Sequence, residues 1–551
     1  MSPSPLTSHP VVGRVVSLAG SVGTPARVLG GSGIVRPLSP AVIARIGRAL
    51  RSWGTGPAGG FTAMALREPD RVGLVDELGS LTYGELQRRS NALARALVER
   101  GVREGDGVAV MCRNHRGFVD ALVATAKCGA DILLLNTAFA GPQLVGVLER
   151  EGPRVVIHDE EFTGLLAEAA VDTRLLGWVD GGDPGLETIE ELIEAYDGSD
   201  LPAPEHHARI VILTSGTTGT PKGAPRSEAG IGAAVSLLSR LPLRYGWRTH
   251  VAAPLFHTWG FAHLALAMLL GSTVVLRRRF DPEECLTVTD EERCDSLVVI
   301  PVMLQRILDL PQEVRDRHPL PHLKVTAASG SALPGDLALE WMDAFGDNLY
   351  NVYGSTEVAY ASIATPRDLR EAPTSAGRPP WATVVKILDR DGVEVPRGES
   401  GRIFVGNGLL FEGYTGASGD VVESKEVIGG LMSTGDIGRY DERGRLHVEG
   451  RDDEMIVSGG ENVFPQEVED CLTRHESVVE AAAIGVADAE FGQRLKVFLV
   501  VEEPAPSVDE LKNWVKLNLA RYKVPRDFVF LGELPRNATG KILKRDLATL
   551  D

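Results

Sequence analysis

The apolar run Ile210–Leu213 is followed directly by Thr214-Ser215-Gly216-Thr217-Thr218-Gly219-Thr220-Pro221-Lys222-Gly223. The apolar run predicts a β-strand, and the residues after it predict a loop. Hydroxyl groups, backbone N–H groups that glycine leaves accessible, and a lysine are the groups that bind a polyphosphate. A Walker A loop needs a second glycine where Pro221 stands, so the pattern is a different one. We therefore interpret residues 214–223 as a phosphate-binding loop.

Apolar runs that predict strands alternate with helical patterns on both sides of this loop. The expected strands are Gly107–Met111, Asp131–Leu135, Val155–His158, Leu175–Val179, His250–Ala253, Ser272–Leu276, Ser296–Ile300 and Lys324–Ala328. This alternation is typical of doubly wound α/β sheets. From residue 383 to residue 450, short β-patterned runs between turns predict a β-barrel, and the residues after Arg451 predict a small α+β domain.

Composition and charge narrow the class of protein. The chain has 551 residues, of which 43% are hydrophobic and 24% are charged, as in a globular enzyme and not in a disordered or fibrous chain. Its net charge of −18 argues against a nucleic-acid partner. Five cysteines without CxxC spacing predict neither a disulfide framework nor a zinc site, and they favour a reducing compartment, the cytoplasm.

The first 67 residues contain seven Arg and no Asp, Glu or Lys. Within a basic extension assigned to residues 1–60, residues 40–53 predict a helix with an apolar face and with Arg45, Arg48 and Arg51 on the other faces. Two hypotheses follow: the helix docks on its own domain, or it lies as a peripheral contact on an anionic membrane. Residues 259–276 are nearly all apolar, and we expect a buried helix followed by a strand there, not a membrane span.

Further motifs rich in Gly, Ser, Thr and ionisable residues follow the loop. They are Pro254-Leu255-Phe256-His257, Ala328-Ser329-Gly330-Ser331-Ala332-Leu333-Pro334-Gly335, Asn351-Val352-Tyr353-Gly354-Ser355-Thr356-Glu357, Ser433-Thr434-Gly435-Asp436, Gly450-Arg451-Asp452-Asp453-Glu454-Met455-Ile456, Ser458-Gly459-Gly460-Glu461-Asn462 and Pro535-Arg536-Asn537-Ala538-Thr539-Gly540-Lys541-Ile542. In this order the motifs resemble those of the adenylate-forming superfamily, which contains acyl-CoA synthetases, luciferases and peptide-synthetase adenylation domains. The resemblance covers about residues 60–550.

The resemblance implies an α/β fold of two domains. The large N-terminal domain, residues 61–452, is expected to contain two doubly wound α/β sheets and the β-barrel of residues 383–450. A small, mobile α+β domain, residues 453–551, is expected to turn about a hinge at Asp453.

The resemblance also implies roles around ATP and Mg²⁺. Tyr353 stacks on adenine, Thr356 contacts the α-phosphate, and Asp436 accepts both ribose hydroxyls. Glu357 and Thr214 hold Mg²⁺, which offsets negative charge on the phosphate oxygens. The expected ATP-binding residues are Thr214, Ser215, Gly216, Thr217, Thr218, Gly219, Lys222, Gly330, Ser331, Ala332, Tyr353, Gly354, Ser355, Thr356, Asp436, Arg451 and Lys541.

A two-step reaction in one active site follows from the same resemblance. A carboxylate attacks the α-phosphate of ATP to give acyl-AMP and pyrophosphate, the small domain turns, and the thiol of coenzyme A then attacks the acyl-AMP. Ser458, Gly459 and Gly460 are expected to let the pantetheine arm of coenzyme A pass. The expected catalytic residues are Lys541, Thr356, His257 and Lys222.

The acid is expected in an acyl pocket lined by His257, Trp259, Phe261 and Val352. These side chains supply no carboxylate for an amino group, so a medium- or long-chain fatty acid is favoured, with aromatic and sterol-derived acids as alternatives. A fatty-acyl-AMP ligase that loads a carrier protein and a nucleotide-binding adaptor without turnover are further alternatives. The absence of a G-x-S-x-G sequence argues against a serine hydrolase. A homodimer is left open.

Overall fold

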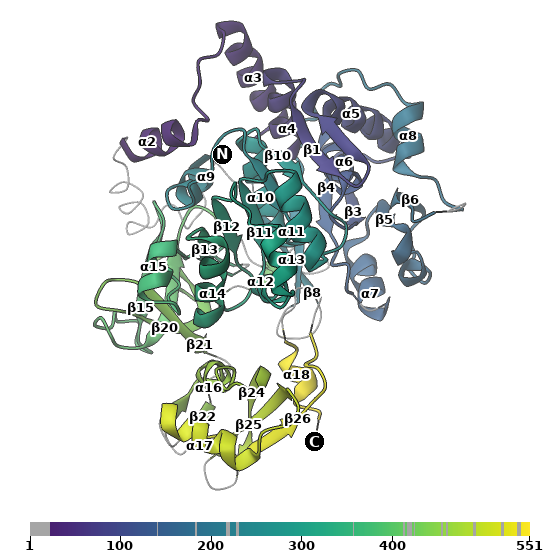
Figure 1. Cartoon of the computed structure of the whole chain (residues 1–551). Coiled ribbons are helices and arrows are strands. Elements are labelled where there is room, and N and C mark those ends of the chain that lie inside the picture. The colour runs from purple at the N-terminus through teal and green to yellow at the C-terminus, as the bar shows by residue number, and fades with distance from the viewer. Residues whose placement is uncertain are drawn as a thin grey trace.

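The structure is a computed structural model of the chain. It describes residues 23–139, 141–181, 185–215, 221–226, 231–355, 357–410, 414–415, 421–423, 425–452, 456–458, 461–488, 492–519, 523–536 and 542–550. Strands in these residues form two eight-stranded sheets and two five-stranded sheets (Figure 1). The expected α/β class, with a large N-terminal domain and a small C-terminal one, is confirmed.

The first large sheet has its six inner strands parallel and its two edge strands, β14 and β2, antiparallel. In spatial order the strands are β14 (Ser362–Ala364), β13 (Leu349–Tyr353), β12 (Val325–Ala328), β11 (Ser296–Val299), β9 (Arg248–Val251), β10 (Thr273–Val275), β1 (Val72–Asp76) and β2 (Gly79–Thr82).

The second large sheet carries the phosphate-binding loop expected at residues 214–223. In spatial order its strands are β18 (Val421–Glu423), β17 (Tyr414–Thr415), β8 (Pro221–Arg226), β7 (Ile210–Ser215), β4 (Asp131–Leu134), β3 (Gly107–Met111), β5 (Val155–Asp159) and β6 (Thr173–Trp178). β7 and β8 are antiparallel, with Thr214 opposite Lys222. The connection is therefore shorter than expected, because residues 214–215 and 221–223 lie in strands.

One core fills the space between the two large sheets and receives side chains from both. On β3, Val108 and Val110 point into this core, and Ala109 and Met111 point to the outer face, where α7 covers them. The helices of the large unit are α2 (Gly23–Ser32), α3 (Pro40–Trp53), α4 (Pro57–Arg67), α5 (Tyr83–Glu99), α6 (Arg116–Lys127), α7 (Gly141–Glu151), α8 (Ile189–Ala195), α9 (Ile231–Leu238), α10 (Thr258–Leu269), α11 (Pro282–Glu291), α12 (Pro301–Leu308), α13 (Gln312–Arg317), α14 (Gly335–Phe345) and α15 (Pro366–Glu371).

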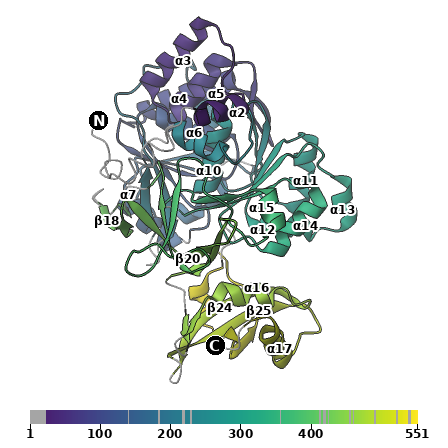
Figure 2. The ribbon, with the colours of Figure 1, turned by 90° about the vertical axis from the view of Figure 1, so that its left-hand side faces the viewer.

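A smaller sheet corresponds to the expected β-barrel. Its strands are β15 (Val384–Leu388), β16 (Gly401–Gly406), β20 (Leu431–Tyr440), β19 (Val427–Ile428) and, paired with β20, β21 (Leu446–Arg451). β17 and β18 come from the same stretch of the chain but join the second large sheet, where Thr415 pairs with Gly223 of β8. Figure 2 shows β18 away from β20 of the smaller sheet. The assignment of all of residues 383–450 to the barrel was therefore too broad.

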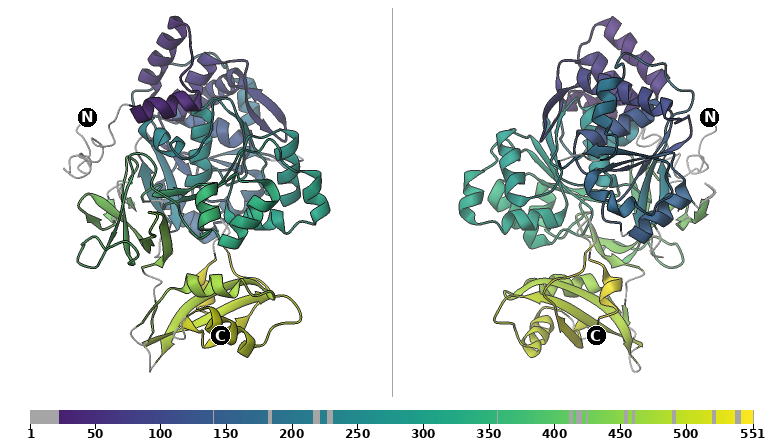
Figure 3. Two further views of the ribbon diagram at one scale, coloured as in Figure 1. Left: turned by 60° about the vertical axis from the view of Figure 1, so that its left-hand side comes forward. Right: turned by 90° about the vertical axis from the view of Figure 1, so that its right-hand side faces the viewer.

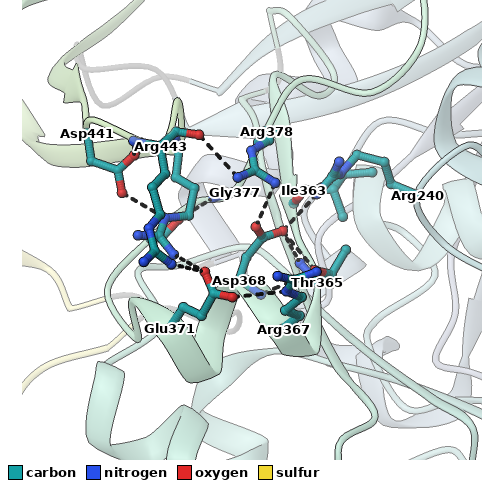
Figure 4. Close-up of polar contacts among 12 residues, drawn as sticks. Arg240, Ile363, Thr365, Arg367, Asp368, Glu371, Gly377, Arg378, Asp441 and Arg443 are labelled. Atoms are coloured by element: carbon teal, nitrogen blue, oxygen red, sulfur yellow. Dashed lines mark hydrogen bonds and ion pairs between the residues drawn. The ribbon is translucent and has the colours of Figure 1, made fainter. Parts of the chain in front are cut away.

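An ionic network fixes this smaller sheet to the first large sheet (Figure 4). Asp368 of α15 is 4% exposed and pairs with Arg240 at 2.7 Å and with Arg378 at 3.2 Å. Glu371, one turn later, pairs with Arg443 at 2.7 Å and with Arg445 at 3.1 Å in the turn between β20 and β21. α15 is thus bonded on one side to the segment after α9 and on the other to the smaller sheet.

The C-terminal unit has its own sheet and two small cores. Its strands are β23 (Glu461–Val463), β22 (Ile456–Ser458), β25 (Gly492–Val501), β24 (Val478–Asp488) and β26 (Asp527–Phe530), and its helices are α16 (Pro465–Leu472), α17 (Val508–Asn518) and α18 (Lys544–Leu547). Helices α16 and α17 pack on one face of this sheet and α18 on the other. Figure 3 shows the unit set apart from the rest of the molecule, next to the smaller sheet.

The basic helix α3 packs on the rest of the molecule through part of its apolar face, and Ile43 stays 55% exposed. Ala49 is buried, and Trp53 packs against the main core. Arg45, Arg48 and Arg51 are exposed. None of the helices in the described residues has the length and apolarity needed to cross a bilayer.

Candidate active site

The predicted site residues gather at one edge of the first large sheet. β13, β12, β11 and β9 are neighbouring parallel strands, so their carboxyl ends share that edge. Tyr353 is the last residue of β13. Gly330 follows the end of β12, and His257 follows the end of β9. In open α/β sheets this is the edge at which ligands bind.

Tyr353 joins this edge to the smaller sheet. Its hydroxyl donates to the Asp436 carboxylate and lies 3.3 Å from Thr434 Oγ1. Asp436 of β20 lies opposite Arg451 of β21, whose Nη1 is 3.4 Å from Asp436 Oδ1. The structure therefore brings together three residues that the sequence assigned to one nucleotide.

The protonation of this cluster follows from its burial. Burial raises the pKa of Asp436, while the hydrogen bond from Tyr353 and the charge of Arg451 act to lower it. Burial, and then the neighbouring Asp436 carboxylate, raise the pKa of Tyr353 well above its usual range. The phenol therefore stays protonated and donates, which leaves the carboxylate as the acceptor that a ribose diol requires.

The loop expected to bind adenine exposes its backbone. Gly330, Ser331 and Ala332 are exposed beside the end of β12. Gly330 has φ +100°, where any side chain is strained, and a Cβ there lies 3.3 Å from Ile300 Cγ2. The backbone conformation at Gly330 thus lets a flat ligand approach the main chain of this loop closely.

Glu357 supplies the carboxylate expected to hold Mg²⁺. It is 8% exposed, and its Oε1 lies 3.6 Å from the ammonium of Lys425. Ser355, two residues earlier, has a buried hydroxyl oxygen with no hydrogen-bond partner. Oxygen ligands of this kind suit Mg²⁺, and the lysine shows that the position accepts positive charge, so these residues fit the metal.

The residues predicted for the acyl pocket divide between two apolar clusters. Trp259 packs against both the main core and a second cluster, which contains Val352. Phe261 packs against the main core. The indole Nε1 of Trp259 donates to the carbonyl of Val299 at 3.0 Å, and its ring meets His263 edge to face at 4.1 Å.

His257 is the N-cap residue, immediately before α10. Its Nε2 is buried without a hydrogen-bond partner, and burial lowers its pKa to about 4. The imidazole is therefore neutral at pH 7. A neutral ring whose centroid lies 4.4 Å from that of Phe256 suits contact with an acyl group better than it suits a charge.

Several predicted residues lie outside the residues that the structure describes. They are Gly216, Thr217, Thr218, Gly219, Thr356, Asp453, Gly459, Gly460 and Lys541. For Thr214, Ser215, Lys222 and Ser458 the structure gives the strand position, in β7, β8 and β22. Their assignments stay predictions.

Sequence reasoning missed three residues of this region. Thr434 Oγ1 accepts from the backbone N–H of Asp436 at 3.1 Å. This hydrogen bond fixes the backbone conformation of the residue that carries the carboxylate. Lys425 meets Glu357. His263 lies one turn after Trp259, and its spacing of four on an apolar helix was the one signal that could have indicated it.

Comparison with known proteins adds independent evidence. A model of the AMP-binding enzyme family matches residues 61–415, and a model of the AMP-binding enzyme C-terminal domain matches residues 467–541. A feruloyl-CoA synthase from Amycolatopsis sp is 35% identical over 476 residues, which are 85% of this chain and 93% of the relative. A 2-succinylbenzoate–CoA ligase from Bacillus subtilis (strain 168) is 32% identical over 482 residues, 87% of this chain and 95% of the relative.

Solved structures agree with these relatives. An anthranilate CoA ligase in complex with anthranoyl-AMP has a TM-score of 0.80 and 25% identity, with 90% of this chain and 96% of that chain covered. An o-succinylbenzoate CoA synthetase from Bacillus subtilis, in complex with its acyl-adenylate intermediate, has a TM-score of 0.77 and 28% identity, with 89% and 98% covered.

Proposed function

This chain belongs to the AMP-binding enzyme family, and from that premise we propose that it activates an aromatic carboxylic acid for transfer to coenzyme A. It is an AMP-forming acid–thiol ligase that works through an acyl-AMP intermediate and uses ATP, Mg²⁺ and coenzyme A. The identity of the acid is the part that is proposed.

The proposed chemistry uses the residues as follows. The acid's carboxylate oxygen bonds to the α-phosphorus, the bond from that phosphorus to the bridging oxygen breaks, and pyrophosphate leaves. Asp436 accepts from the ribose, and Lys541 offsets the charge that develops between carboxylate and phosphate. Glu357 and Thr214 would hold Mg²⁺, which would neutralise charge on the phosphate oxygens. The thiol of coenzyme A, after losing its proton, then attacks the acyl carbon, and AMP leaves.

The acyl pocket carries the proposal of an aromatic acid. Trp259 and His263 form an edge-to-face pair on α10, and the indole is fixed by its bond to Val299. A rigid aromatic wall favours a flat ring over a flexible chain, because a ring loses less conformational entropy when it is bound. Nδ1 of His263 donates to the carbonyl of Trp259 at 3.2 Å, so the neutral ring leaves Nε2, which is buried without a partner, as an acceptor for a ring hydroxyl. The relatives named for feruloyl and succinylbenzoyl substrates support the same class over the fatty acid that the sequence favoured.

Release of pyrophosphate across a panel of acids tests the proposal. We expect sustained release with hydroxycinnamic or benzoic acids only when ATP and coenzyme A are both present, and a single burst when coenzyme A is left out. Faster turnover with medium- or long-chain fatty acids than with every aromatic acid would contradict the proposed substrate. Acid-dependent release that coenzyme A does not sustain would point to a carrier protein as the acceptor.

We also propose that α3 makes a peripheral contact with an anionic membrane through its basic face. Ala49 is buried and Trp53 packs against the main core, while Ile43 of the same helix is 55% exposed. Arg45, Arg48 and Arg51 stay exposed, and residues 1–67 contain no acidic side chain to neutralise them. Exposed arginines near a bilayer surface are attracted by about 1 kcal/mol each.

Sedimentation with vesicles tests this contact. We expect binding to phosphatidylglycerol vesicles and not to phosphatidylcholine vesicles, and about 100-fold weaker binding when all three arginines are changed to Ser. A matched variant changes three exposed arginines of other segments, Arg367, Arg390 and Arg397, to Ser. Equal loss in both variants, or no binding by the unaltered protein, would remove the proposal.

A further inference from the structure

Asn114 lies in the connection between β3 and α6, far along the chain from the site, and it is 5% exposed. Its side-chain Nδ2 donates to the carbonyls of Val251 at 3.1 Å and Ala253 at 2.9 Å. Its Oδ1 accepts from the backbone N–H of Leu255 at 2.9 Å. One side chain thus makes three hydrogen bonds to the main chain at the carboxyl end of β9.

The segment that Asn114 binds is the one that presents His257. From the other side, the N–H groups of Ala252 and Ala253 donate to the carbonyl of Val298, in β11. The N–H of His257 then closes a turn onto the carbonyl of Pro254 at 3.2 Å. Hydrogen bonds from Asn114 on one side and from β11 on the other therefore hold residues 251–255 in place. His257 follows two residues after Leu255, the last residue that Asn114 contacts.

The first turn of α10 is packed closely on this segment. A Cβ at Gly260 lies 2.3 Å from the carbonyl oxygen of Pro254, so the helix and the segment touch through main chain. A shift of residues 251–255 therefore moves the start of α10 as well. Both His257 and Trp259 lie in that part of the chain.

Asn114 itself is held rigidly by its neighbours. The next residue, His115, is fully buried, and its Nε2 lies 2.8 Å from Asp159 Oδ1 at the end of β5. Arg116 bonds through its backbone N–H and its guanidinium to Asp76 at the end of β1. The connection is thus tied to the ends of strands in both large sheets.

His115 takes part in this anchor and not in a metal site. Cys112, His115 and Asp159 lie close together, with ligand atoms within 4.8 Å of one another. However, Nδ1 of His115 accepts from the Gly117 N–H at 3.0 Å, which makes Nε2 the protonated nitrogen that donates to Asp159. Cys112 is directed to the carbonyl of Ile157 at 3.7 Å.

We infer that Asn114 is a positioning residue for the acyl side of the active site, acting through the main chain that carries His257. The inference rests on the proposed function, because it concerns how the acid is bound. Loss of the three hydrogen bonds frees residues 251–255 from one side and displaces His257 and Trp259 from the acid. The ribose side, which is built on β13, β20 and β21, stays in place.

The test is a matched pair of variants, Asn114→Ser and Asn348→Ser. Asn348 is 4% exposed and also makes three hydrogen bonds, with Thr326, Trp341 and Phe345, at the opposite end of the same sheet. Both variants are expected to lose similar thermal stability. Only Asn114→Ser is expected to raise KM for the acid, by about 10- to 100-fold, with KM for ATP and the affinity for AMP changed by less than about threefold.

A double-mutant cycle adds a readout that a purely structural role does not move. In a His257→Ala background, Asn114→Ser is expected to have little further effect on KM for the acid, because both changes act on one segment. Should Asn114→Ser not fold, Asn114→Asp keeps the acceptor for Leu255 and is compared in the same way. Equal changes in KM for the acid from both asparagine variants, or full additivity with His257→Ala, would overturn the inference. Failure of the unaltered enzyme to release pyrophosphate with any acid would instead refute the proposed function.

Discussion

The Asp436 carboxylate receives a phenol from one strand and a guanidinium from another, so its two oxygens are held in one orientation. Such a carboxylate is preorganised for a vicinal diol, because the two donors fix its orientation. Neither Tyr353 nor Arg451 competes for the same oxygen, since they contact Oδ2 and Oδ1 respectively.

The variant Asp436→Asn is expected to raise KM for ATP by about 10- to 100-fold, because hydrogen bonds to a charged group contribute about 1.5–3 kcal/mol. Steady-state kinetics at saturating acid and coenzyme A measure it. Asp441→Asn is the control, since Asp441 pairs with Arg445 at 2.7 Å in the turn that follows β20. An unchanged KM for ATP in Asp436→Asn contradicts the role assigned to this carboxylate.

Three buried histidines predict how stability depends on pH. Burial lowers the pKa of His250 to about 3 and those of His257 and His263 to about 4, each from 6.5. Below pH 6.5 the unfolded chain binds protons that the folded protein does not, so stability falls as pH falls toward 4. The expected loss is about 1.4 kcal/mol per histidine for each pH unit at most.

Urea unfolding at pH 7 and pH 5 measures this loss. The variant His250→Asn removes one of these groups and is expected to make the dependence of stability on pH shallower. Equal stability of the unaltered protein at the two pH values would show that these imidazoles titrate normally.

Residues that act through side-chain motifs were predictable, and residues that act through main chain were not. Tyr353, Asp436 and Arg451 stand in motifs, and the structure brings them together as expected. Asn114 had no recognisable sequence signal. Its partners are backbone groups about 140 residues away, and every residue type has such backbone groups.

Helices and strands followed the sequence where hydrophobic periodicity was strong. The parallel strands β9, β11 and β12 were expected within a residue or two, since each is a short apolar run between turn signals. The exception was the segment with β17 and β18, whose partner β8 lies in a distant part of the chain. Local pattern carries no information on which sheet such a short edge strand joins.

The network on α15 gives a prediction at this scale. Asp368→Ala leaves Arg240 and Arg378 without their common buried carboxylate and is expected to lower the free energy of unfolding by about 3–5 kcal/mol. Urea unfolding followed by tryptophan fluorescence measures it.

The control for this change is Asp343→Ala. Asp343 pairs with Arg370 at 2.6 Å, but its side chain is 69% exposed, so about 0–1 kcal/mol is expected. Similar losses in the two variants would mean that the α15 network does not join the smaller sheet to the large one.

At the scale of the whole molecule, the residues predicted for the reaction lie in two structural units. Tyr353, Asp436 and Arg451 lie in the large unit, while Lys541 and Ser458 belong to the stretch of chain that forms the small one. The division was predictable from the order of the motifs. The orientation of the small unit was not, because no pattern in a sequence specifies how two cores with few mutual contacts are arranged.

Separate assays of the two half-reactions test the predicted alternation of the small unit. Lys541→Ala is expected to slow acyl-AMP formation by about 100- to 1,000-fold and to spare thioester formation from supplied acyl-AMP. Lys544→Ala is the control: Lys544 pairs with Glu469 at 2.9 Å within the same unit and is expected to leave both steps near normal. Equal losses of both half-reactions in Lys541→Ala would rule out separate roles.

The pairing of β8 with β17 has a consequence for the nascent chain. Strand β8 leaves the ribosome with one edge unpaired, and the residues that pair with this edge follow about 190 positions later. Because translation adds about 5–20 residues per second, the edge stays open for about 10–40 s. An open edge is a template for pairing with other chains. The hairpin of β7 and β8 is therefore exposed to misassembly during translation until the segment around residue 415 pairs with its open edge.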